Sequence, residues 1–238
     1  MENDPSLASD APSCASLRDV AAPARAPLDT GGLLASAIAI HEAGHAIVSR
    51  FLGLPLGGAT IVPTGEYGGL TFGPGEDSLN VTRASLREEA QHQCDGAMEL
   101  LPPAGCRRDS TSSWLVYAQS QILGLMAGFA AEELAGFSRD LEAQSTDVEI
   151  ARIYGRTCFV SEDGVTSFLA ACRADAIKIL RDHWLAVMDV AVALDGKQAL
   201  SGIEIDAIII EAEQRAVHVA ELQRRARMAA MTAKAKSA

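Results

Sequence analysis

Apolar residues recur with helical spacing along most of the chain after its first thirty residues. The pattern predicts a first helix over 33–52, which Gly53 and Pro55 would end because glycine terminates helices and proline cannot continue them. Thr146 and Glu149 have the spacing of a capping box, which marks the start of a later helix. Further helices are expected over 82–100, 114–134, 147–154, 164–194 and 203–229. We therefore expect a mainly α protein.

Two short apolar segments after the first helix break this pattern. Residues 59–63 and 70–72 flank a glycine-rich turn, which predicts a small β-hairpin or sheet beside the first helix. Pro63 cannot donate a hydrogen bond to a neighbouring strand. The first strand is therefore expected to lie at a sheet edge or to end there.

The two ends of the chain lack a core-forming pattern. Residues 1–30 are rich in Ala, Pro, Ser and Asp without periodicity, which is typical of a disordered tail. The last predicted helix becomes basic, and we interpret this as a solvated end. We expect one domain over 31–229 and a flexible tail over 230–238.

Composition narrows the function classes. The chain has 238 residues, of which 48% are apolar and 5% aromatic, so it can bury a substantial core, and the low aromatic content favours packed helices. The net charge of −11 would repel a phosphate backbone, which argues against nucleic acid as a partner.

The cysteines and the N-terminus indicate a compartment. Five scattered cysteines without a paired C-x-x-C motif fit free thiols in a reducing environment. No secretory signal is recognisable, and the most apolar stretch, 33–40, is too short to span a bilayer. We expect a cytoplasmic protein without membrane insertion.

The first predicted helix contains the sequence His41-Glu42-Ala43-Gly44-His45, an H-E-x-x-H match. Two histidines four residues apart project from one helix face, about 6 Å apart along the axis, and can bind one metal ion. Zinc lowers the pKa of a bound water to about 7, and the intervening glutamate can accept the proton. Chance spacing of two ordinary histidines is the alternative, but buried unpaired polar groups in an apolar helix would be costly.

A catalytic zinc needs a third protein ligand. Neither an extended metzincin spacing nor an inverted motif is present, and the remaining histidines have no partner at ligand spacing. Carboxylates are better candidates, and the spacing alone leaves Glu132, Glu133 and Asp147 open.

The zinc motif and three later segments resemble the peptidase domain of the FtsH family of membrane-bound, ATP-dependent zinc proteases. The zinc motif continues through Ala46-Ile47-Val48 and is followed by the strand–turn–strand segment. The later segments are Gly128 to Leu134, similar to the family's A-A-E-E helix, and Ser145 to Glu149. The resemblance covers about residues 35–210.

The resemblance implies a zinc site with His41, His45 and Asp147 as ligands and Glu42 as general base. It leaves Glu132 and Glu133 as candidates for structural or supporting carboxylates. The simpler interpretation is that both are exposed helix residues. It also implies a homo-oligomer, since the family's peptidase domains assemble as hexamers. We therefore expect a zinc metalloendopeptidase that hydrolyses peptide bonds in unfolded or flexible protein substrates.

The chain also departs from the family. No G-x-x-x-x-G-K-[ST] phosphate loop and no membrane anchor are found in it, so a separate ATPase partner is one alternative. A catalytically idle, zinc-stabilised binding module is another. Residues 91–112 look like an insertion, where His92, Cys94 and Cys106 are a weak candidate for a second metal site.

Overall fold

The computed structural model describes residues 35–63, 66–76, 81–101, 109–137 and 145–236. All of these residues belong to one compact unit. The N-terminal tail predicted over 1–30 lies outside the described residues.

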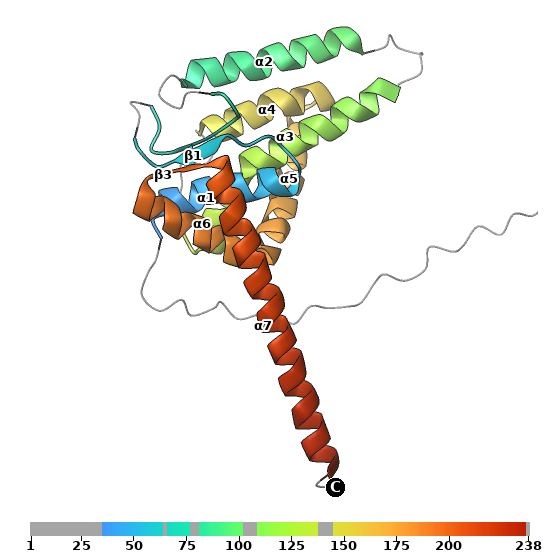
Figure 1. Cartoon of the computed structure of the whole chain (residues 1–238). Coiled ribbons are helices and arrows are strands. Elements are labelled where there is room, and N and C mark those ends of the chain that lie inside the picture. Colours follow the sequence, from blue (N-terminus) through green and yellow to red (C-terminus); the bar gives the residue numbers. More distant parts are fainter. Residues whose placement is uncertain (1–34, 64–65, 77–80, 102–108, 138–144, 237–238) are drawn as a thin grey trace, which may run out of the picture. The chain divides into compact units, whose positions relative to one another are not determined.

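Helices account for most of the described chain, which confirms the predicted mainly α fold (Figure 1). They are α1 Ala37–Phe51, α2 Arg83–Leu100, α3 Asp109–Leu134, α4 Thr146–Cys158, α5 Glu162–Asp182, α6 Trp184–Lys197 and α7 Gly202–Lys236. None of these helices is long and apolar enough to cross a membrane.

A small antiparallel sheet lies beside α1. It has the order β2-β1-β3, with β1 Gly58–Thr60 in the middle, β2 Leu70–Phe72 on one side and β3 Ala199–Ser201 on the other. The predicted hairpin is therefore confirmed. Of the two expectations for the first strand, the edge position is wrong because β1 is paired on both sides, whereas an end near Pro63 agrees with a strand that stops at Thr60. Three residues between two long helices are too few to reveal β3 in the sequence.

The core is built around α1, which packs on α3 and α6. Small residues allow this close approach: a Cβ on Gly44 would lie 2.6 Å from the carbonyl oxygen of Ala127 and 2.7 Å from Cβ of Ala131. Any side chain at Gly44, or one larger than alanine at Ala127 or Ala131, would push the two helices apart. The alanine-rich composition thus produces a tight helix pair that holds the H-E-x-x-H motif.

Two predicted helix boundaries differ from the structure. The N-cap of α4 is Ser145 and not Thr146: the side chain of Ser145 accepts from the backbone N–H of Val148, and Glu149 pairs with Arg87 of α2. The segment predicted as one helix over 164–194 is split at His183, which ends α5 and begins α6. Both helices bury residues in the same core, so the apolar pattern continues through the break.

Helices α2 and α7 differ in how they contact the rest of the described chain. Helix α2 packs on α4, beside the start of α3 (Figure 1). Helix α7 continues to Lys236, beyond the predicted end at residue 229, and residues 213–220 and 222–232 are exposed. This agrees with the interpretation of its basic end as a solvated segment.

Candidate metal centre

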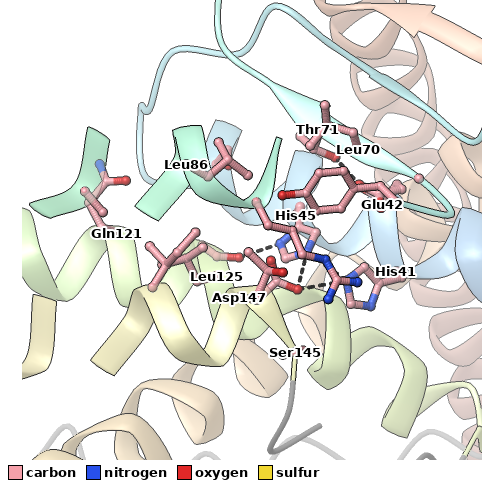
Figure 2. A pocket seen from close by; sticks show the side chains of 18 of the residues that line it. His41, Glu42, His45, Leu70, Thr71, Leu86, Gln121, Leu125, Ser145 and Asp147 are labelled. Carbon is pink, nitrogen blue, oxygen red and sulfur yellow. Dashed lines mark hydrogen bonds and ion pairs between the residues drawn. The ribbon is translucent and has the colours of Figure 1, made fainter. Parts of the chain in front are cut away.

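Three predicted ligands meet at one point, contributed by α1 and by the first turn of α4. Nε2 of His41 lies 3.0 Å from Nε2 of His45 and 3.3 Å from Oδ2 of Asp147. Nε2 of His45 lies 3.8 Å from the same carboxylate oxygen. Figure 2 shows the three side chains converging. Within the described part of the chain, this is the one group of three or more such side chains close enough to share a metal ion.

Helix α3 fixes the orientation of both imidazoles. Nδ1 of His41 lies 3.0 Å from the carboxylate of Glu132, and Nδ1 of His45 lies 2.7 Å from the carbonyl oxygen of Gly124. Hydrogen bonds of this kind fix the tautomer of a metal-binding histidine and point its other nitrogen at the metal. The two Nε2 atoms are therefore aimed toward Asp147.

A glycine on α3 makes room for the His41 ring. A Cβ at Gly128 would lie 2.4 Å from Cε1 and 2.5 Å from Nε2 of this ring, which no real contact allows. The next residue, Phe129, packs edge-on against the same ring at a centroid distance of 5.0 Å. The ring is thus held between the α3 backbone and an aromatic side chain.

The lone pairs that the two histidines and Asp147 present to one another fit a bound cation. A carbonyl oxygen can only accept, so Nδ1 of His45 carries a hydrogen and Nε2 of the neutral ring is a lone-pair acceptor. His41, when neutral and donating to Glu132, also presents a lone pair at Nε2. Two such lone pairs 3.0 Å apart, beside a carboxylate, need a proton or a metal ion between them. Two imidazoles and one carboxylate are the donor set of a catalytic zinc site with an open position.

Known proteins with similar sequences include zinc proteases, although no family model matches the chain. The chain is 27% identical over 187 residues to the ATP-dependent zinc metalloprotease FtsH of Endomicrobium trichonymphae, covering 72% of this chain and 29% of that protein. It is 27% identical over 191 residues to the ATP-dependent zinc metalloprotease FtsH 4 of Sorangium cellulosum (strain So ce56), covering 72% and 28%. The chain thus has a distant similarity to FtsH proteases and spans less than a third of their length. Together with the His-His-Asp cluster, this similarity is compatible with a zinc metalloprotease.

Glu42 lies buried next to this cluster and is held by β2. The hydroxyl of Thr71 donates to Oε2 of Glu42 at 2.8 Å, and a Cβ at Gly69 would lie 2.8 Å from Oε1. Burial raises the pKa of Glu42 above its ordinary value, against the opposing effects of His45, His41 and the Thr71 hydrogen bond. A buried carboxylate of raised pKa is a stronger base than an exposed one.

Without a metal, His41 carries a proton beside an ionised Asp147. Burial alone would lower the pKa of His41, but its hydrogen bonds to Asp147 and Glu132 outweigh burial and raise the pKa to about 10. Burial likewise opposes ionisation of Asp147, but the hydrogen bond from His41 and the nearby imidazole of His45 hold its pKa well below the usual range. The metal-free site therefore holds a charged imidazolium–carboxylate pair.

The candidate metal centre opens into a cavity of about 470 Å³. Its walls come from α1, the 66–71 segment, α2, α3 and α4, and they carry apolar side chains beside the polar cluster. Leu70, Leu86 and Leu125 lie around the labelled polar residues in Figure 2. A cavity of this size can take side chains of a peptide next to the metal ligands.

The structure separates the other candidate residues. Glu132 is 2% exposed and contacts His41, so its interpretation as an exposed helix carboxylate is wrong, whereas Glu133 is exposed and pairs with Arg173. His92 is exposed and Cys94 is buried on α2, which does not favour a second metal site, and Cys106 lies outside the described residues.

The sequence did not indicate the contributions of Gly124, Gly128 and Thr71. Gly124, Gly128 and Glu132 follow one another at four-residue spacing on α3, the face that meets α1. This spacing was a possible signal for a helix face that supports the site.

Proposed function

We propose that this protein is a zinc-dependent metalloendopeptidase acting on unfolded or flexible protein chains. His41, His45 and Asp147 would hold the zinc ion, and Glu42 would be the general base. The observation that carries the proposal is the convergence of two oriented Nε2 atoms and one carboxylate oxygen beside a buried glutamate.

Zinc bound there would polarise the peptide carbonyl and acidify a water molecule. The protein's own residues carry the remaining steps. Glu42 accepts a proton from the attacking water and delivers it to the nitrogen of the leaving amine, so that one peptide bond is broken and one carboxyl and one amine are formed. Thr71 keeps the Glu42 carboxylate in place through its 2.8 Å hydrogen bond.

Among the described residues β2 is an edge strand, and we propose that an extended peptide pairs with it. Strand β1 is paired on both sides, so it offers no edge at which a substrate strand could add. Leu70 and Thr71 of β2 line the cavity, and an edge strand can accept a peptide through main-chain hydrogen bonds. Such binding requires an extended backbone, which favours unfolded or flexible substrates.

The names of the similar proteins support one variant of this function. Both are ATP-dependent, so a separate ATPase could deliver unfolded substrate to this peptidase. The same proposal includes a homo-oligomer, a hexamer by the resemblance to the FtsH family. It also includes a cytoplasmic location. The idle-module alternative is disfavoured by Glu42, because a purely structural zinc site needs no buried base beside it.

The test is cleavage of an unfolded, fluorescently labelled protein by the zinc-loaded chain without ATP. We expect cleavage by the wild type, loss of at least about 100-fold in Glu42→Gln with zinc still bound, and loss of both zinc and cleavage in Asp147→Ala. Glu88→Gln, an exposed carboxylate on α2, is the matched control and should cleave normally. A zinc-loaded wild type that cleaves nothing would favour the idle module, or the partner-dependent peptidase if an added ATPase restores cleavage.

A further inference from the structure

Tyr67 has a buried hydroxyl that lacks a hydrogen-bond partner among the described residues. It lines the cavity next to the candidate metal centre. The other two tyrosines of the chain, Tyr117 and Tyr154, both donate to Oε1 of Gln93. Buried hydroxyls are nearly always paired, so an unpaired one that lines the cavity is free to bond to a group that enters it.

The segment that carries Tyr67 is fixed against Glu42. Gly69 leaves no space for a side chain between this segment and Glu42, and the Thr71 hydroxyl donates to the carboxylate of Glu42 at 2.8 Å and lies 3.2 Å from its backbone oxygen. On the other side, Arg83 donates to the carbonyl oxygen of Glu66, and its guanidinium lies 5.8 Å from the centre of the Tyr67 ring. The ring is therefore positioned before any substrate arrives.

Tyr67 lines the same cavity as Thr146 and Asp147 of α4. Burial raises the pKa of Tyr67 to about 12, and the negative charges of Glu66 and Asp147 act in the same direction. Thr146 is near enough to oppose this shift, although no hydrogen bond of regular geometry joins the two hydroxyls. The phenol thus keeps its proton at neutral pH and is available as a donor.

We propose that Tyr67 is a catalytic residue that donates a hydrogen bond to the carbonyl oxygen of the scissile peptide bond as negative charge develops there. The inference rests on the proposed peptidase function and adds a residue to it. The hydroxyl keeps its proton throughout, and no bond to it forms or breaks. Donors that are already oriented toward developing charge accelerate such reactions by about 100- to 1000-fold.

Tyr67→Phe removes only the hydroxyl and tests the proposal. We expect kcat for cleavage of the labelled substrate to fall about 100-fold or more, with KM and zinc content nearly unchanged. Tyr117→Phe is the matched control, because its phenol is paired and lies outside the cavity lining, and it should keep the wild-type kcat. A Tyr67→Phe variant with wild-type kcat would overturn the proposal while leaving the peptidase function intact.

A binding measurement separates this proposal from the peptidase function. The probe is a phosphinic peptide, in which a tetrahedral phosphinate replaces the scissile amide, with leucine side chains on both sides. Zinc-loaded Tyr67→Phe should bind it at least about tenfold more weakly than wild type and Tyr117→Phe, as measured by calorimetry. Equal affinities, or no binding by the wild type, would overturn the proposal, whether or not cleavage is observed.

Thermal unfolding of the metal-free variants excludes a merely structural role. Removing an unpaired buried hydroxyl should leave the Tm of Tyr67→Phe equal to or above that of the wild type, whereas Tyr117→Phe loses a hydrogen bond and should not gain stability. A clear fall of Tm in Tyr67→Phe would show that its hydroxyl stabilises the fold and would contradict the proposal.

Discussion

At the scale of single residues, the buried carboxylate of Glu132 gives His41 its orientation. It is 2% exposed and lies 3.0 Å from Nδ1 of His41, while the adjacent Glu133 points to the surface. A carboxylate at this position makes the imidazole a better electron donor and fixes its tautomer. Two neighbouring glutamates on one helix thus have different roles because of the helix face on which each lies.

Glu132→Gln preserves the size of the side chain and removes its charge. We expect zinc affinity to fall about 10- to 100-fold, measured by competition with a chromophoric chelator. Glu133→Gln is the matched control and should bind zinc as the wild type does. Equal zinc affinity in both variants would mean that Glu132 does not support the site.

The sequence alone predicted some residues of the site but not others. The proximity of His41 to His45 follows from helix geometry alone, because residues four apart share a face. Spacing left Asp147 open among three carboxylates, and the resemblance to FtsH assigned it. Glu132 was not placed from the sequence: its four-residue spacing from Gly128 marks a shared helix face, but its burial depends on the packing of α3 on α1.

At the scale of elements, the first turn of α4 positions Asp147. The side chain of Ser145 accepts from the backbone N–H of Val148 at 3.2 Å and so fixes where this helix begins. Free N–H groups and the helix dipole at this end favour an anionic side chain. The location of the third ligand therefore depends on a helix cap.

Ser145→Ala removes this cap and Ser161→Ala removes the equivalent cap of α5, whose serine accepts from the N–H of Gly164. Each variant should lose about 0.5–2 kcal/mol of stability in urea unfolding of the metal-free protein. Weaker zinc binding is expected only for Ser145→Ala. Equal effects of the two variants on zinc affinity would argue against a role of the α4 cap in positioning Asp147.

The long helices were easier to predict than the short elements. Periodicity located α1, α2 and α3 to within a few residues, because each carries several turns of apolar pattern. It missed β3, which has three residues, and the break at His183, which does not interrupt the apolar pattern. The central place of β1 depends on β3, whose partner is far away in sequence, so the sheet order could not be deduced.

At the scale of the whole molecule, the metal-free site links stability to pH. The pKa of His41 is raised from 6.5 to about 10 in the folded protein. A raised pKa means that the folded state holds a proton that the unfolded chain releases more easily. The resulting stabilisation is complete below about pH 6.5 and is lost as the pH rises toward 10.

We therefore expect the Tm of the metal-free protein to fall between about pH 6.5 and 10, measured by calorimetry in the presence of a chelator. Zinc requires a neutral imidazole, so zinc binding at pH 7.5 should release about one proton, detected from the heats in buffers of different ionisation enthalpy. The zinc-loaded protein should not show the same decline of Tm. A metal-free Tm that is constant over this range would contradict the assignment of the proton to His41.

The central claim is that His41, His45 and Asp147 hold one zinc ion in this chain, and zinc-edge anomalous diffraction from crystals of the zinc-loaded protein tests it most directly. We predict one anomalous peak per chain, about 2.0–2.2 Å from Nε2 of both histidines and from an Asp147 carboxylate oxygen. A peak at another set of residues, or no peak in protein crystallised with saturating zinc, would contradict the claim.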